Sequence, residues 1–298
     1  MTTEAARAGV TEPSTAALLT EEIRFGRADL HVQTIRGEDA SNARSIFDRI
    51  ERRDELDVVV IAARDCIEGT LDARKVHAAN DYGFEFVSGL VVTSADGPVL
   101  GLWIDEPIAS GGSLAETVAA IHAMDGVTVV PHPLAWLMRS VGRIALERVL
   151  AGHERASCPD AIQVASGSSR EAAGSRKALE LNAMHWHLPE VGASGAVFEE
   201  RVASAYTLFP GTLRPGARAV ELRGAITAGT TVAVAGPRVP LRRMGIRRVV
   251  EQRGRELRFG WGRTVGPVLQ PFMRHRPDGG SGAGDSDTRG VGSSGESR

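Results

Sequence analysis

The chain has 298 residues, 42% of them hydrophobic, which is enough for one large domain or two small ones. A net charge of −2 argues against a protein that binds polyanions over its whole surface. No apolar run approaches the roughly 18 residues of a membrane span, and the N-terminus has no apolar signal segment. Two cysteines, Cys66 and Cys158, lack CxxC spacing, so we expect a reduced, cytoplasmic protein without a transmembrane segment.

The charge is unevenly distributed along the chain. Residues 211–276 carry 14 arginines and three glutamates, a local balance of +11 that leaves −13 for the remainder. The basic patch Arg242, Arg243, Arg247 and Arg248 lies in this stretch and predicts binding to nucleic acid or to an anionic membrane surface. The alternative is that these arginines pair with acidic side chains of the protein itself.

Strands and helices are expected to alternate from residue 23 onward. Apolar patterns predict strands at 24–32, 57–62, 84–93, 98–104, 127–130, 160–165 and 190–194. Helical spacing predicts helices at 41–53, 71–82, 113–124, 134–150 and 170–183. Residues 1–22 are expected to form a flexible arm, and the Gly/Ser-rich residues 277–298 a disordered tail.

Local signals place several of the boundaries. Ser41 is a plausible N-cap, and Gly83 is expected to stop the second helix. Ser113 and Glu116 have the spacing of a capping box. Because so many strands alternate with helices within about 190 residues, a small closed barrel is favoured over an open sheet. In such barrels, chemistry occurs where strands end and enter their loops.

The predicted strand ends carry recognisable motifs. They read Asp29-Leu-His-Val-Gln33, then Arg64-Asp-Cys-Ile-Glu-Gly69, then Pro131-His-Pro133. In order and spacing these motifs resemble those of the PHP (polymerase and histidinol phosphatase) family of metal-dependent phosphoesterases, and within it the nucleoside-phosphate phosphatases and short-RNA exonucleases. The resemblance implies a distorted (β/α)7 TIM-like barrel of the PHP type over residues 23–236. An arginine-rich C-terminal extension would follow at 237–276.

The resemblance also implies a metal site that has degenerated. His31 and His132 stand at surviving histidine positions of the family, but the second histidine of the first motif is Gln33. The remaining ligand positions fall on residues that are poor or impossible ligands: Ala63, Arg64, Val91, Gly195 and Val197. A catalytic metal site needs at least three protein ligands. We therefore expect no cofactor; were one bound, it would be a divalent metal (Mn, Zn or Mg) on His31 and His132.

Arg64 is the most informative of the replacements. Its guanidinium would fill the vacated metal position and bind a phosphate-containing ligand, in a pocket with Asp29, Gln33 and Asp65. The alternative is a structural ion pair between Arg64 and Asp29 or Asp65. His31 and His132, likewise, either retain a single metal or only hydrogen-bond their neighbours.

Two further candidate sites, Cys66 and the pair His185 and His187, can also be interpreted as residues without a functional role. Cys66 is either a nucleophile beside a histidine or a small buried side chain. His185 and His187 have HxH spacing but are expected at an exposed helix-to-strand loop.

The sequence thus predicts an inactive PHP homologue, a pseudoenzyme that binds an anion around Arg64. One alternative is an active phosphoesterase with a reduced or rebuilt metal site. Another is a nucleic-acid- or membrane-associated protein that acts through its basic C-terminal segment.

Overall fold

The computed structural model describes residues 23–34, 39–136, 138–152, 154–168 and 171–236. The predicted N-terminal arm (1–22), arginine-rich extension (237–276) and tail (277–298) lie outside these residues, as does the basic patch at 242–248. In the described part of the chain, no helix combines the length and the apolarity needed to cross a bilayer.

Nine strands of the described residues form one sheet of mixed direction. In sheet order they are β7-β6-β5-β4-β3-β2-β1-β8-β9. Their bounds are β1 Arg24–Val32, β2 Val58–Arg64, β3 Glu85–Thr93, β4 Pro98–Leu102, β5 Val127–Val130, β6 Ala161–Ser166, β7 Glu190–Ala193, β8 Ala205–Gly211 and β9 Val232–Ala235. The pairs β1–β2, β2–β3, β5–β6 and β6–β7 are parallel, whereas β4, β8 and β9 pair antiparallel to their neighbours.

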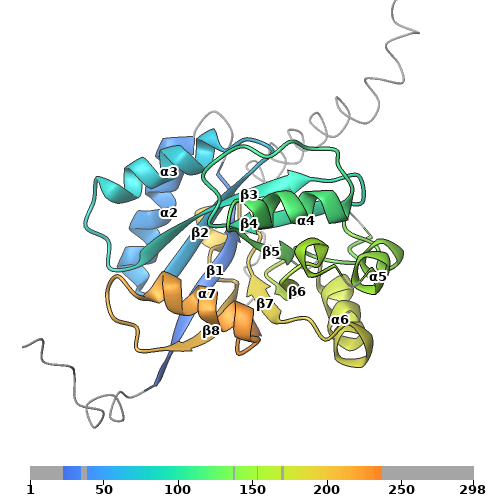
Figure 1. The fold of residues 1–298 in the computed structure, drawn as a ribbon. Helices are drawn as coiled ribbons and strands as arrows, with labels where there is room; N and C mark the ends of the chain where they lie inside the picture. The colour runs from blue at the N-terminus through green and yellow to red at the C-terminus, as the bar shows by residue number, and fades with distance from the viewer. Residues whose placement is uncertain (1–22, 35–38, 137, 153, 169–170, 237–298) are drawn as a thin grey trace, which may run out of the picture. The chain divides into compact units, whose positions relative to one another are not determined.

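The sheet curls into a nearly closed, barrel-like form (Figure 1). Val32, at the end of β1, forms an isolated parallel bridge with Ala196, just after β7. The Thr207 hydroxyl of β8 accepts from the Gly192 amide at 3.0 Å and donates to the Gly192 carbonyl at 2.8 Å. A Cβ on Gly192 would lie 2.3 Å from the Tyr206 carbonyl oxygen, so only glycine permits β7 to approach β8 this closely.

Among the described residues, six α-helices accompany the strands, as Figure 1 shows. They are α2 Asp39–Arg53, α3 Glu68–Ala78, α4 Leu114–Ala123, α5 Arg143–Ala151, α6 Ala172–Leu181 and α7 Arg218–Ala228. A π-helical turn, Asn182–Trp186, continues α6. The Ser113–Glu116 capping box opens α4 as its sequence predicts.

Buried side chains form distinct cores on the two faces of the sheet. On β2, Val58, Val60 and Ala62 pack into one cluster, whereas Val59 and Ile61 pack into another with α2. This alternation follows from the two-residue period of a strand. The first cluster also contains Leu30, Val91, Val129, Val191 and Phe209, so it is the interior of the barrel.

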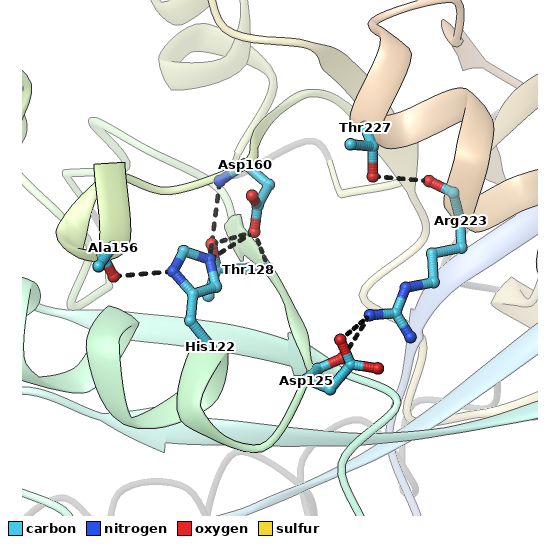
Figure 2. A network of polar contacts seen from close by, with 7 residues as sticks. All are labelled: His122, Asp125, Thr128, Ala156, Asp160, Arg223 and Thr227. Atoms are coloured by element: carbon cyan, nitrogen blue, oxygen red, sulfur yellow. Dashed lines mark hydrogen bonds and ion pairs between the residues drawn. The ribbon is translucent and has the colours of Figure 1, made fainter. Parts of the chain in front are cut away.

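Helix α7 closes the barrel at the amino-terminal ends of the strands. Glu85, the first residue of β3, accepts from the amides of Gly216, Arg218 and Ala219. Arg223 of α7 donates to the Asp125 carboxylate just before β5, as Figure 2 shows. With this end occupied by a helix, the carboxyl ends of the parallel strands form the mouth.

A network of hydrogen bonds connects α4 to β5 and to Asp160, just before β6 (Figure 2). The ring nitrogens of His122 lie 2.8 Å from the Ala156 carbonyl oxygen and 2.8 Å from Asp160 Oδ2. The same carboxylate oxygen accepts from the amide and the hydroxyl of Thr128, both at 2.7 Å. His122 of α4 and Thr128 of β5 therefore share one carboxylate, that of Asp160, which lies 38 and 32 residues further along the chain.

Several predicted helix boundaries are wrong; for example, the helix expected from residue 71 begins at Glu68. The helix expected at 134–150 begins only at Arg143, because residues 134–141 close a loop in which Leu134 donates to the Val141 carbonyl and has a φ of 59°. The first helix begins at Asp39, so Ser41 lies inside it. The second helix ends at Ala78 rather than at Gly83. Just beyond this end, the Asn80 side chain donates to the Val76 carbonyl.

Candidate functional site

The barrel mouth brings together three of the predicted site residues. His31 lies on β1, Arg64 is the last residue of β2, and His132 follows β5. Arg64 is two residues beyond Ala62 and therefore extends from the strand face that lines the barrel interior. Strands far apart in sequence thus place a guanidinium and two imidazoles at one end of the barrel.

The two histidines form a buried pair. Their ring centroids are 6.2 Å apart with 23° between the ring planes, and their exposed fractions are 1% for His31 and 5% for His132. Among the described residues, neither Nδ1 atom has a hydrogen-bond partner. A buried polar atom without a partner costs about 1–3 kcal/mol unless a ligand or water satisfies it. The mouth therefore contains two unsatisfied ring nitrogens.

Gln33 determines which atom of His31 carries the proton. The amide Nε2 of Gln33 lies 3.0 Å from Nε2 of His31. An amide nitrogen can only donate, so the ring Nε2 accepts and the proton of the neutral imidazole resides on Nδ1. The unsatisfied atom of His31 is consequently a donor rather than a lone pair.

Arg64 acts electrostatically on both rings. Burial lowers the pKa of His31 well below its usual value, with further lowering by the charges of His132 and Arg64. Burial, followed by the Arg64 charge, lowers the pKa of His132 to about 4. Both rings are therefore neutral at pH 7, and the positive charge of Arg64 acts on both of them.

The side chain of Asp29 makes its hydrogen bonds with backbone amides. Its fully buried carboxylate accepts from the amides of Ser194 and Ala203, both at 3.0 Å, and from the amide of His31 at 3.4 Å. Burial raises the pKa of Asp29, while these hydrogen bonds act in the opposite direction. Asp29 thus ties the end of β1 to the loops after β7.

Asp65 has a comparable structural contact. Its carboxylate oxygens accept from the amide and the hydroxyl of Thr93, at 2.7 and 2.8 Å, which joins the ends of β2 and β3. The neighbouring thiol of Cys66 donates to the Glu68 carboxylate at 2.8 Å, and burial, followed by the Glu68 contact, raises its pKa. A raised pKa disfavours the thiolate, so this thiol lacks the activation of a nucleophile.

Gln163 on β6 is a positioning residue that sequence reasoning missed. Its Oε1 accepts from the His132 amide at 3.1 Å, while its Nε2 donates to the carbonyls of Ala165 and Ala193. His132 itself has a φ of 33°, a left-handed conformation that few side chains adopt. The only sequence signal was a polar residue within the apolar strand Ala161–Ser166.

Glu171 is the second residue that sequence reasoning did not single out. It lies 6% exposed beside the ends of β6 and β7, and its Oε2 accepts from the Ser166 hydroxyl. A Cβ on Gly195 would meet the two carboxylate oxygens of Glu171 at 3.9 and 4.0 Å. Nothing in the local pattern distinguished this glutamate from solvent-exposed ones. His185 and His187, by contrast, are exposed as expected.

The donors do not fit a divalent metal. His31 presents a protonated nitrogen, and the Asp29 and Asp65 carboxylates accept hydrogen bonds from the protein. Within the described ranges, no group of three or more His, Cys, Asp or Glu side chains could hold a metal ion. The nearby Arg64 charge further opposes a cation.

Comparisons with known proteins support the fold. No protein-family model matches the chain. A protein described only as uncharacterized, MJ1587 of Methanocaldococcus jannaschii, is 25% identical over 139 residues, which cover 43% of this chain and 80% of that protein. The crystal structure of PsfC from Pseudomonas syringae PB-5123 superposes with a TM-score of 0.52 at 15% identity, covering 71% of this chain and 91% of that chain. This similarity shows the shared α/β barrel fold alone.

Weaker similarities extend to two other barrels. An amidohydrolase from Chromobacterium violaceum gives a TM-score of 0.43 at 17% identity, covering 69% of this chain and 97% of that chain. A proposed metal-dependent phosphoesterase from Bifidobacterium adolescentis gives 0.43 at 14%, covering 63% and 89%. TM-scores below 0.5 are too low to support an inference about chemistry.

Proposed function

We propose that this chain is a non-catalytic relative of the PHP phosphoesterases, built on their distorted (β/α)7 barrel. In this proposal the strand-end pocket has lost its metal site and binds a phosphate-containing anion through Arg64. The observation that carries the proposal is the Arg64 charge beside two buried imidazoles, His31 and His132. We place the protein in the cytoplasm.

The polarity of the unsatisfied atoms favours an anion over a metal. A metal binds a lone pair, whereas an oxyanion binds an N–H. Gln33 makes Nδ1 of His31 a donor, and the guanidinium of Arg64 has donors only. The same mouth that is unfavourable for a cation therefore offers donors to phosphate.

Phosphate binding tests the proposal directly. Arg64→Gln keeps much of the side-chain size but removes the charge, and we expect a 10- to 100-fold loss of affinity for inorganic phosphate. Isothermal titration calorimetry at low salt measures it. Arg176→Gln, at an exposed position on α6, is the matched control and should bind as the wild type does. Equal affinity in the Arg64 and Arg176 variants would refute the role of Arg64.

Metal content and turnover test the non-catalytic half of the proposal. Purified, untagged protein should retain less than stoichiometric Mn, Zn or Mg after dialysis. It should not hydrolyse a generic phosphoester above the rate of a His31→Ala variant. Stoichiometric metal with turnover that His31→Ala abolishes would instead establish the alternative, an active phosphoesterase with a rebuilt site.

The arginines of residues 237–276 support a separate proposal. Arg242, Arg243, Arg247 and Arg248 would bind nucleic acid or an anionic membrane surface, because four positive charges lie within seven residues. Such binding should weaken steeply with salt and disappear when residues 237–298 are deleted. Phosphate binding at Arg64 should be unaffected by that deletion, which separates the two proposals.

A further inference from the structure

The position of one proton decides what the buried His31 ring can bind. Burial lowers the pKa of His31 well below its usual value, so the imidazole is neutral at pH 7. A neutral imidazole is the form that coordinates metal ions, through the ring nitrogen that carries the lone pair. The charge state of the ring therefore does not exclude a metal, and the location of its single proton becomes decisive.

The two nitrogens of the His31 ring have different surroundings. Nε2 lies 3.0 Å from the side-chain amide nitrogen of Gln33, whereas Nδ1 is buried and has no hydrogen-bond partner among the described residues. Because Gln33 donates to Nε2, the lone pair of that atom is engaged and the proton resides on Nδ1. Neither nitrogen therefore offers its lone pair to a metal.

The backbone holds Gln33 next to the ring. The backbone amide of Gln33 donates to the Ala196 carbonyl at 2.7 Å, and the preceding residue, Val32, forms a parallel bridge with Ala196. Residue 33 follows His31 by two positions at the end of an extended strand, so the two side chains lie on the same side of the chain. The end of β1 thus places the Gln33 amide against the imidazole.

We propose that Gln33 excludes a metal from His31 by holding the ring proton on Nδ1, and that a carboxylate at position 33 reverses this. In Gln33→Glu the side chain can only accept, so Nε2–H donates to it and Nδ1 carries the lone pair. Gln33 is then a positioning residue that acts through His31. The proposal concerns a cation and does not depend on anion binding at the mouth.

Nitrogen-15 NMR of the ring tests the proposal, because protonated nitrogens and lone-pair nitrogens differ widely in chemical shift. The His31 signals, identified by their loss in His31→Ala, should show a protonated Nδ1 in the wild type and a protonated Nε2 in Gln33→Glu. Added Zn²⁺ should then shift the His31 ring signals of Gln33→Glu but not those of the wild type. His185, at an exposed position, is the internal control: before zinc is added, its signals should be the same in both proteins.

Each outcome decides the proposal. A protonated Nε2 in the wild type would overturn it, since the amide oxygen of Gln33 would then face the ring. A reversed tautomer in Gln33→Glu without a zinc-dependent shift at His31 would also overturn it, because the proton would not be what excludes the metal. Should Gln33→Glu not fold, Gln33→Leu removes the donor and should populate both tautomers; an unchanged single tautomer would contradict the role of Gln33. Phosphate titration of the wild type decides the proposed function separately.

Discussion

At the scale of single residues, two carboxylates of the strand-end motifs, Asp29 and Asp65, form structural hydrogen bonds. Asp29 stands at the first position of the motif that resembles a metal-binding sequence, yet its oxygens accept backbone amides from two loops. Asp65 accepts from Thr93 in a similar way. Since a buried carboxylate without a partner is costly, these hydrogen bonds from the protein stabilise both carboxylates in the fold.

Removing the Asp29 carboxylate tests this interpretation. Asp29→Ala leaves the buried amides of Ser194 and Ala203 without an acceptor, which should lower the free energy of unfolding by about 3 kcal/mol. Urea denaturation measures the change. Asp72→Asn, which affects only an exposed pair with Lys75, should change it by less than about 0.5 kcal/mol. A loss below about 1 kcal/mol in Asp29→Ala would contradict the structural role.

At the scale of elements, individual polar contacts connect segments of the chain. The local sequence pattern does not show that these segments are neighbours in space. His122, near the end of α4, connects Ala156 and Asp160, which lie more than 30 residues away. The carboxylate of Asp160 also joins the start of β6 to Thr128 of β5. The apolar pattern locates α4, β5 and β6, but these contacts fix how they meet.

His122→Ala should therefore loosen this junction. It removes two contacts of 2.8 Å, one of them to a carboxylate, and should lower the free energy of unfolding by about 2 kcal/mol. Amide hydrogen exchange should rise first at Thr128 and Asp160. His185→Ala, at an exposed position, is the control and should stay within about 0.5 kcal/mol of the wild type. Unchanged exchange at Thr128 would rule out the proposed connection.

At the scale of the whole molecule, the buried imidazole pair makes stability depend on pH. The folded-state pKa of His132 is about 4, below the unfolded value of 6.5, and that of His31 is also lowered. Between these values the unfolded chain binds protons that the folded chain does not, so stability falls as the pH falls. The raised pKa of Asp29 acts in the opposite sense, adding stability as the pH falls.

We expect the wild type to lose about 2 kcal/mol of unfolding free energy through His132 between pH 7 and pH 5. His132→Asn should remove that part of the loss, since asparagine does not titrate and tolerates the positive φ. Urea denaturation at the two pH values measures both proteins. An identical pH dependence in the wild type and the variant would show that His132 titrates alike in the folded and unfolded chain.

Much of the element order could be predicted from the sequence. The strands at 24–32 and 127–130 match β1 and β5, and the capping box at Ser113 opens α4. These succeed because apolar periodicity and capping are local properties. The helix predicted from residue 134 failed because Leu134 belongs to a closed loop whose geometry depends on Val141.

The sequence alone determined the alternation of strands and helices and the presence of Gln33, Arg64 and Gly195 at the ends of predicted strands. Only the tertiary structure decided that the Arg64 charge acts on His31 and His132, that Asp29 accepts from the Ser194 amide and that Asp65 accepts from the Thr93 amide. It also revealed Glu171 and Gln163, which no motif marks. The physical reason is that residue identity is local, whereas burial, proton position and the field of a charge depend on groups brought together from distant strands.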